Sequence, residues 1–108
     1  MKNNLNKNYV ILKNLIRESG TFLSANQLEI LTNINPKEVS RIIRRMQEKG
    51  NHEIFMLNNY GYIYFENATF EQKCLIYKAI TNKKDKLFNE YLHYKKMSDF
   101  LEKEIYEN

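Results

Sequence analysis

Apolar residues recur every three or four positions along the first part of the chain, which is the spacing of an amphipathic helix. The pattern runs over residues 5–19, after a loose polar leader at residues 1–4, and Gly20 is expected to close the helix. We expect a short extended piece to follow at residues 21–23. The predicted core positions of the helix are Leu5, Tyr9, Leu12, Leu15 and Ile16.

A second, shorter helix is predicted from its capping residues. Ser24 is a favoured N-cap residue, and Gln27 three positions later completes a capping box, in which each side chain accepts from the other's backbone N–H. Leu28 and Leu31 are expected to face the core. Asn33 ends the helix because asparagine tolerates the left-handed backbone conformation.

The third helix, over residues 36–49, carries the clearest signals in the chain. Asn35 is its predicted N-cap, with Glu38 completing a second capping box. Pro36 suits the first helical position, and Gly50 suits the left-handed residue that follows a helix. Helical spacing turns four apolar residues inward, namely Val39, Ile42, Ile43 and Met46. The residues left pointing outward are Lys37, Ser40, Arg41, Arg44 and Arg45.

The hydrophobic pattern then changes to that of strands. Residues 53–57 and 62–65 are rich in strand-forming side chains, and a four-residue turn over residues 58–61 separates them. This pattern predicts a β-hairpin in which Gly61 supplies a positive φ.

A long helix is predicted for the rest of the chain. Thr69 and Gln72 form a third capping box, and a weak point is expected near Thr81 and Asn82, two poor helix formers. Steps of four and three residues define a heptad-like seam, which comprises Leu87, Tyr91, Tyr94, Ser98, Leu101 and Ile105. Phe88, Met97 and Phe100 widen it.

So small a domain lacks the core needed to cover this seam, which favours self-association over folding back onto the monomer. The predicted dimerisation residues are Leu87, Phe88, Tyr91, Tyr94, Leu101 and Ile105. We therefore expect a mainly α-helical chain with a small β-hairpin, divided into residues 1–68 and a helical dimerisation region, 69–108, packed on the same core.

Charge is concentrated in the first half of the chain. Residues 1–50 carry nine Lys or Arg against four Asp or Glu, whereas residues 51–72 carry three Glu and no Lys or Arg. Residues 73–108 carry eight basic against six acidic residues, and the whole chain has a formal net charge of +4. The positive field therefore centres on the first half of the chain, which includes the basic third helix and favours a nucleic-acid partner.

This order of elements, and the motif from Leu28 to Gly50, resembles the winged helix-turn-helix family. The segment from Val39 to Gly50 is similar to the recognition helix of multiple-antibiotic-resistance-type repressors, and the resemblance covers about residues 5–66. Glu29 stands where these motifs usually carry a small residue, and Asn33 replaces the usual turn glycine. Glu29 is expected either to lean out and pair with an arginine or to loosen the packing of the two helices.

The resemblance implies contacts with double-stranded DNA. Lys37, Ser40 and Arg41 lie near the start of the recognition helix, where base contacts are usual, and Arg44, Arg45 and Lys49 are expected at phosphates. The hairpin lacks basic residues. Asn58 and Asn59 at its tip are candidates for the minor groove and Tyr60 for a sugar contact, with the alternative that these residues only make the turn.

Other classes of function find little support. His52 and His93 show no metal-ligand spacing with Cys74, the single cysteine, which is expected to be a small buried residue. No nucleophile or phosphate-binding motif is present, so we expect no enzyme, no cofactor, no metal and no small-molecule ligand. Without a signal peptide, a disulfide or a membrane-spanning stretch, the chain is expected to be cytoplasmic, away from membranes.

Three functions stay open at this stage. The first is a homodimeric transcriptional regulator that reads an operator with residues 36–49. The second is a plasmid or phage DNA-maintenance protein on repeat arrays, resembling the adaptors of tubulin-type partition systems or the proteins that mark a transfer origin in conjugation. The third is a protein-interaction module that does not bind DNA.

Overall fold

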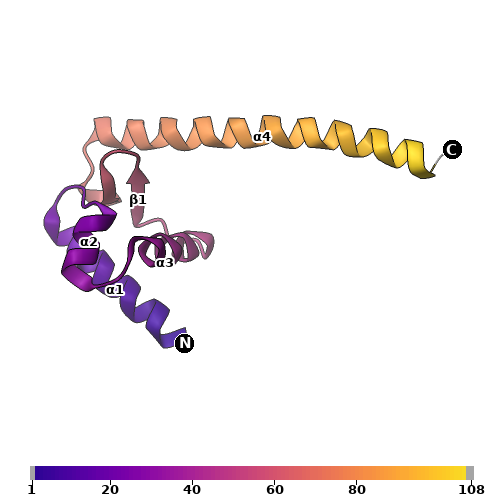
Figure 1. The fold of residues 1–108 in the computed structure, drawn as a ribbon. Helices are drawn as coiled ribbons and strands as arrows, with labels where there is room; N and C mark the ends of the chain where they lie inside the picture. The colour runs from indigo at the N-terminus through magenta and orange to yellow at the C-terminus, as the bar shows by residue number, and fades with distance from the viewer. Residues whose placement is uncertain (1, 107–108) are drawn as a thin grey trace. The chain divides into compact units, whose positions relative to one another are not determined.

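The computed structural model describes the backbone of residues 2–106 and the side chains of residues 6–106. Its helices are α1 (Lys2–Ser19), α2 (Ala25–Thr32), α3 (Pro36–Glu48) and α4 (Phe70–Tyr106), with a 3-10 turn, η1 (Phe65–Asn67), before α4 (Figure 1). Strands β1 (Ile54–Leu57) and β2 (Gly61–Tyr64) form an antiparallel hairpin. The predicted fold class, mainly helical with a small hairpin and a long C-terminal helix, is confirmed.

The element boundaries follow the predicted capping residues closely. Gly20, Asn33 and Gly50 all adopt positive φ where their helices end. The Ser24–Gln27 box is complete, with Ser24 N–H donating to Gln27 Oε1 at 2.8 Å and Gln27 N–H donating to Ser24 Oγ at 3.1 Å. The polar leader was predicted wrongly, since α1 already begins at Lys2, and the side chain of Leu5 lies outside the described residues.

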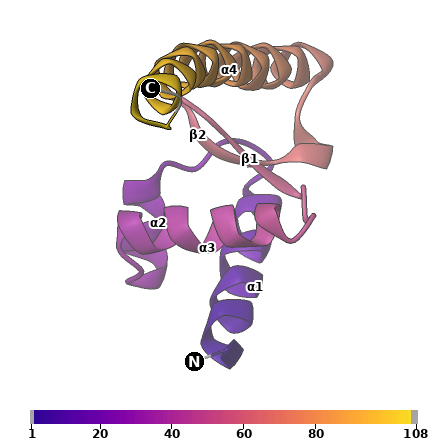
Figure 2. The same cartoon turned by 90° about the vertical axis from the view of Figure 1, so that its right-hand side faces the viewer.

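Two compact units make up the chain, residues 1–76 and residues 77–108, called here the N-terminal and C-terminal units. The N-terminal unit therefore includes the first turns of α4, beyond the division after residue 68 expected from the sequence. Within it, α3 crosses α1, and α2 lies beside the start of α3 (Figure 2).

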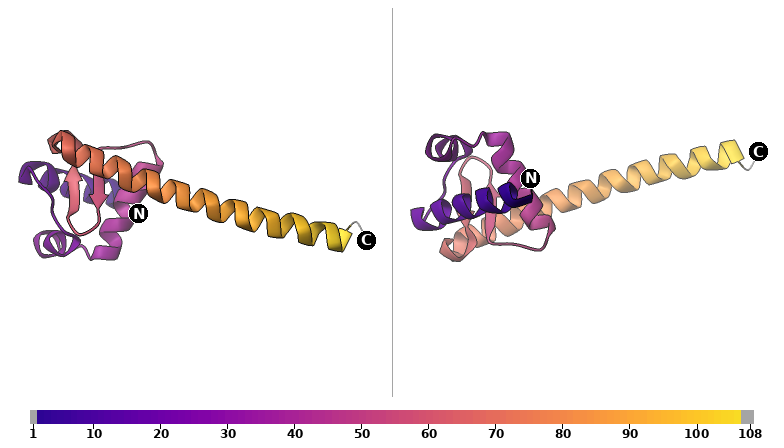
Figure 3. Two further views of the ribbon diagram at one scale, coloured as in Figure 1. Left: turned by 90° about the horizontal axis from the view of Figure 1, so that it is seen from above. Right: turned by 90° about the horizontal axis from the view of Figure 1, so that it is seen from below.

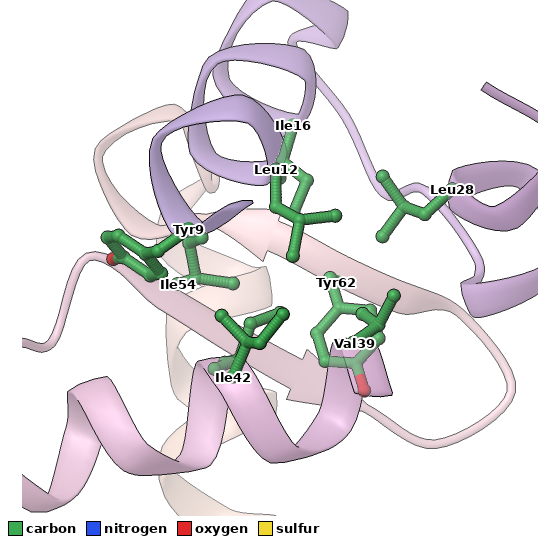
Figure 4. Packing of buried hydrophobic residues seen from close by; sticks show 9 residues of the cluster. Tyr9, Leu12, Ile16, Leu28, Val39, Ile42, Ile54 and Tyr62 are labelled. Carbon is green, nitrogen blue, oxygen red and sulfur yellow. The ribbon is translucent and has the colours of Figure 1, made fainter. Parts of the chain in front are cut away.

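The main core of the N-terminal unit lies where α1, α2 and α3 meet one face of the hairpin (Figure 4). Tyr9, Leu12 and Ile16 enter it from α1, and all three are at most 4% exposed. The other buried members are Leu28, Val39, Ile42, Ile43, Ile54 and Tyr62, with Leu15 and Met46 packed at the edge. Leu31 was expected to face this core but is 58% exposed. In the eight-residue α2, Ala25 and Leu28 supply the inward face, and Ile34 of the following turn packs there as well.

A second, smaller cluster forms on the other face of the hairpin. Side chains alternate between faces along a strand, so Ile63 points away from its neighbours Tyr62 and Tyr64. Ile63 is buried with Ala68 and with Ile76 of α4, and Phe55 and Phe65 pack against them. These contacts place the first turns of α4 in the N-terminal unit.

The hairpin is tied to the segment before α2 by a third extended piece. Leu23 forms an antiparallel bridge with Tyr62, through Leu23 N–H to Tyr62 O at 2.9 Å and Tyr62 N–H to Leu23 O at 2.8 Å. Of the extended piece expected at residues 21–23, Thr21 lies in a bend, whereas Leu23 forms this bridge. Its close approach is possible because Gly61 has no side chain: a Cβ there would lie 2.4 Å from the Leu23 carbonyl oxygen.

Helix α4 runs without interruption over 37 residues, and both views of Figure 3 show it as one continuous helix. The weak point expected at Thr81 and Asn82 is therefore wrong, because good helix formers on both sides carry the helix through it. The predicted cap is present, with Gln72 N–H donating to Thr69 Oγ1 at 3.1 Å.

Cys74 was predicted to be buried but is exposed. Helix α4 presents Ile76 to the smaller cluster, and Cys74 lies two positions away, about 200° around the helix. None of the helices formed by residues 2–106 combines the length and the apolar character needed to cross a membrane.

Candidate nucleic-acid interface

Helix α3 is anchored by its inner face. Val39 and Ile42 are completely buried, and Ile43 is 3% exposed. Gln47 adds a polar anchor that the sequence pattern does not reveal, since its Nε2 donates to the carbonyl oxygen of Ile54 at 2.8 Å. The helix is thus fixed both to the other helices and to β1, so its outer residues sit on a rigid support.

The outer face of α3 is cationic and exposed to solvent. Successive helical steps place Lys37, Arg41, Arg44 and Glu48 in one stripe, with Ser40 on one side and Arg45 on the other. The residues predicted to touch DNA from this helix are all exposed, namely Lys37, Ser40, Arg41, Arg44, Arg45 and the C-cap residue Lys49. The structure therefore brings these six together on one side of a single element.

Two of the arginines make ion pairs within the helix. Arg41 Nε donates to Glu38 Oε2 at 2.9 Å, and Arg41 Nη2 donates to Glu38 Oε1. Arg44 Nε lies 3.5 Å from Glu48 Oε1. Both pairs are exposed, where an ion pair contributes little and is readily exchanged for another partner. Among the described residues, no carboxylate lies within 4.0 Å of the charged groups of Lys37, Arg45 or Lys49.

The capping box predicted for α3 is only half formed. Glu38 N–H donates to Asn35 Oδ1 at 2.9 Å, as expected for the N-cap. Among the residues that the structure describes, the return bond is absent, because the Glu38 carboxylate is bonded to Arg41 instead. Hydrogen bonding to Arg41 lowers the pKa of Glu38, and the charge of Arg45 adds to the effect. Glu38 is therefore an anion held inside the cationic face.

Ser40 lies close to the hydroxyl of Tyr62 on the hairpin. Burial raises the pKa of Tyr62, and the nearby Ser40 side chain partly opposes that effect as a hydrogen-bonding partner. Figure 4 shows this hydroxyl at the α3 end of the core. The sequence pattern indicates Ser40 as a base-contact candidate but gives no such sign for Tyr62, which has only the alternating pattern of a strand residue.

The hairpin tip presents the three predicted residues, Asn58, Asn59 and Tyr60, to solvent. Asn59 adopts φ 73°, and Tyr60 N–H donates to Leu57 O at 3.0 Å, so these residues do make the turn. The Tyr60 ring also lies 5.4 Å from the ring of Phe22, measured between centroids. The tip is thus a defined turn with two exposed amides, and contact with DNA stays a prediction.

The departures from the helix-turn-helix pattern have simple structural outcomes. Glu29 is exposed on α2, and within residues 2–106 no ion pair links it to an arginine of α3. It leans out, and α2 and α3 still pack together through Leu28 and Val39. Asn33 takes the place of the turn glycine at φ 60°, and its N–H donates to Glu29 O at 2.7 Å.

A polar network that the sequence pattern did not predict fixes the segment after α3. The Tyr9 hydroxyl donates to Glu53 Oε2 at 2.9 Å and lies 3.1 Å from Asn51 Oδ1. Lys13 Nζ approaches the same carboxylate oxygen at 3.7 Å. Burial, and then the bond to Glu53, raise the pKa of Tyr9 well above its ordinary value of 10. The spacing of Tyr9 identifies a core residue but gives no sign of its polar partner, which lies 44 positions away.

The residues excluded from metal binding at the outset lie apart. His52 precedes β1 and stacks on Phe55 at 6.3 Å between ring centroids, whereas His93 and Cys74 are on α4. In the part of the chain that the structure describes, no three His, Cys, Asp or Glu side chains gather where they could hold a metal ion.

The predicted dimerisation residues all lie exposed in the C-terminal unit. Leu87, Phe88, Tyr91, Tyr94, Leu101 and Ile105 have exposed fractions between 52% and 66%. Such a run of large apolar side chains is unusual on the surface of a lone helix.

Comparison with known proteins adds no family to this picture. The chain matches no protein-family model, no curated protein and no solved structure.

Proposed function

We propose that this chain is a winged helix-turn-helix protein that binds double-stranded DNA with the outer face of α3. One observation carries the proposal: a short helix anchored by the buried side chains of Val39, Ile42 and Ile43 holds an exposed stripe of arginine and lysine on its outer face. A helix of this kind fits the major groove, where arginine recognises guanine edges and phosphates in bidentate fashion.

The residues of α3 divide by their place along the helix. Lys37, Ser40 and Arg41, near its N-terminus, are the proposed base contacts. Arg44, Arg45 and Lys49 are the proposed phosphate contacts. Arg41 exchanges the carboxylate of Glu38 for DNA, which is a small penalty because that pair is exposed to solvent.

The proposed biological use is transcriptional regulation in the cytoplasm by a homodimer that occupies an operator. The exposed apolar side chains of α4 support the homodimer, and two-fold symmetry matches a palindromic site. A footprint on fragments selected from native DNA separates this use from plasmid partition or conjugative transfer. A short promoter palindrome is expected, whereas a long array of direct repeats would point to DNA maintenance.

The test of DNA binding compares single charge removals on and off α3. Binding to the selected site is measured by fluorescence anisotropy for wild type, Arg44→Ala, Arg45→Ala and Lys7→Ala. Lys7 is an exposed cation of α1, so Lys7→Ala removes the same charge without touching α3. We expect each arginine variant to bind more weakly, with a salt slope smaller by about one for each phosphate that is no longer neutralised, and Lys7→Ala to bind as wild type.

The proposal fails if the arginine variants keep wild-type affinity. If the chain is instead an interaction module that does not bind DNA, Arg41→Ala and Arg44→Ala should leave its function intact. Leu101→Glu, which places a charge in the seam of α4, should then abolish its function. Measuring DNA affinity and association state on each variant therefore distinguishes the two functions.

A further inference from the structure

The apolar face of α4 continues towards the start of the C-terminal unit at the same spacing as the heptad-like seam of Leu87, Tyr91, Tyr94, Ser98, Leu101 and Ile105. Lys84 lies one step before Leu87, and Ile80, which is 47% exposed, lies one step before Lys84. The positions farthest from the seam are all polar, namely Asn82, Asn89, Lys96 and Lys103. The C-terminal unit therefore has one continuous face for a partner, with the exposed Leu92 and Phe100 to either side of it.

The size of this face suits a second helix of the same length. The six predicted dimerisation residues together expose on the order of 700 Å². A stable protein interface buries about 800 Å² on each partner, and the area of the seam is close to that value.

Charge along the C-terminal unit is strongly polarised. Residues 77–89 carry four Lys against one Asp, whereas residues 99–106 carry two Glu and one Asp against one Lys. Two such helices attract each other when the basic end of one meets the acidic end of the other. They repel when like ends meet.

The register of the seam leads to the same orientation. In a parallel pair, Lys84 would face Lys84 of the second copy inside the apolar interface, which leaves two like charges desolvated together. In an antiparallel pair with full overlap, Lys84 is level with Leu101 of the second copy and next to its Glu102. The same register brings Lys83 beside Glu104 of the second copy and Tyr91 beside its Tyr94.

We propose that the α4 helices of two copies pair antiparallel along the seam, with the basic start of each helix against the acidic end of the other. The proposal rests on the proposed homodimer and gives it an orientation. Because each N-terminal unit is joined to the start of its own helix at residues 76 and 77, the two N-terminal units then attach at opposite ends of the helix pair.

A disulfide test distinguishes the orientations in the full-length chain. In a Cys74→Ser background, Lys84→Cys and Leu101→Cys are made separately, oxidised alone, and then oxidised after mixing and re-association. A disulfide needs Cα atoms within about 7 Å. Antiparallel pairing puts position 84 about 25 Å along the axis from its own copy, so only the mixture is expected to form a covalent dimer, between positions 84 and 101. Self-crosslinking of either variant alone, or no crosslink in the mixture, overturns the proposal.

A charge exchange gives a second measurement that does not depend on cysteine chemistry. Lys83→Glu is expected to weaken the dimer in sedimentation equilibrium, and adding Glu104→Lys is expected to restore it. Lys86→Glu is the matched control, because Lys86 is an exposed lysine of the same helix away from the seam. Equal weakening by Lys86→Glu, or no rescue in the double variant, contradicts antiparallel pairing.

The same samples keep this inference separate from DNA binding. A chain that is monomeric at micromolar concentration, or a parallel dimer, overturns the helix pairing even if Arg44 proves essential for DNA affinity. An antiparallel dimer whose affinity for DNA is unaffected by Arg44→Ala overturns the proposed function and leaves the pairing intact.

Discussion

The guanidinium of Arg41 is bonded to the carboxylate of Glu38 one turn earlier on α3, through Nε at 2.9 Å and through Nη2. Arg41 is the central cation of the outer stripe, so the chain holds its proposed base contact in an internal pair before DNA arrives. Glu38 also lies in the first turn of α3, where its negative charge interacts favourably with the helix dipole. One carboxylate therefore stabilises the helix and competes with DNA for the arginine.

Removing that competition is expected to strengthen DNA binding. Glu38→Gln abolishes the ion pair and one negative charge, so Arg41 is released and the cationic face gains a net charge. We expect the dissociation constant to fall by about two- to tenfold at moderate salt, with a smaller difference at high salt where charges are screened. Fluorescence anisotropy at two salt concentrations measures the change.

The control for this prediction is Glu29→Gln, which removes an exposed carboxylate from α2 without releasing an arginine. An equal gain in affinity for both variants would show that net charge alone is responsible. A loss of affinity in Glu38→Gln would contradict the competing role of Glu38.

Gly61 is expected to be the least replaceable glycine in the chain. It has φ 115°, and an added Cβ would lie 2.4 Å from the carbonyl oxygen of Leu23, so Gly61→Ala must break the bridge between Leu23 and Tyr62. We expect a loss of about 2–4 kcal/mol in the free energy of unfolding, measured with urea. Gly20→Ala is the control, since Gly20 has φ 70° but open space around it, and should cost about 1–2 kcal/mol.

Local patterns predicted the elements of this fold because its helices are delimited by strong signals. Ser24, Asn33, Asn35 and Gly50 each do what their side chains or their conformational freedom favour, and the inward face of α3 follows from helical spacing alone. Leu31 and Cys74 were predicted to be buried but are exposed, because a short helix, or the start of a long one, buries only a narrow face. Periodicity shows which residues share a face, but it does not show which of those residues contact the core.

The candidate site was predicted in part for a related reason. Helical spacing places Arg41 and Glu38 on one surface, but the capping-box pattern assigns Glu38 to the backbone of Asn35 when its carboxylate in fact binds Arg41. Contacts between distant segments, such as Tyr62 with Ser40 or Tyr9 with Glu53, have no local sequence signal. They become visible only once the hairpin packs against the helices.

We expect the hydroxyls of Tyr62 and Ser40 to stabilise the attachment of α3 to the hairpin through a hydrogen bond between them. Tyr62→Phe removes it while keeping the ring in the core, and the expected loss is about 0.5–1.5 kcal/mol in the free energy of unfolding. Ser40→Ala should cost a similar amount, and the double variant should cost little more than either single one. Additive losses in this double-mutant cycle would show that the two hydroxyls stabilise the fold independently.

Alkaline pH offers a test of the network around Tyr9. Burial and the bond to Glu53 raise the pKa of Tyr9 in the folded chain above its ordinary value of 10, and burial raises that of Tyr62 in the same direction. The folded chain then holds these protons at a pH where the unfolded chain releases them. The stability they contribute is therefore fully present below pH 10 and is lost as the pH rises above it.

Each such tyrosine makes the free energy of unfolding fall by up to about 1.4 kcal/mol per pH unit above its unfolded pKa. At pH 7, Tyr9→Phe should lower the free energy of unfolding by about 1–2 kcal/mol, because the bond to Glu53 is lost. Above pH 10, the stability of this variant should fall less steeply than that of wild type, because it lacks the titrating hydroxyl. Urea unfolding from pH 7 to 11 measures both, and titrating groups common to the two chains cancel in the difference. If stability falls with pH in parallel for the two chains, Tyr9 titrates alike in the folded and unfolded states. The hydrogen bond to Glu53 would then not stabilise the segment after α3.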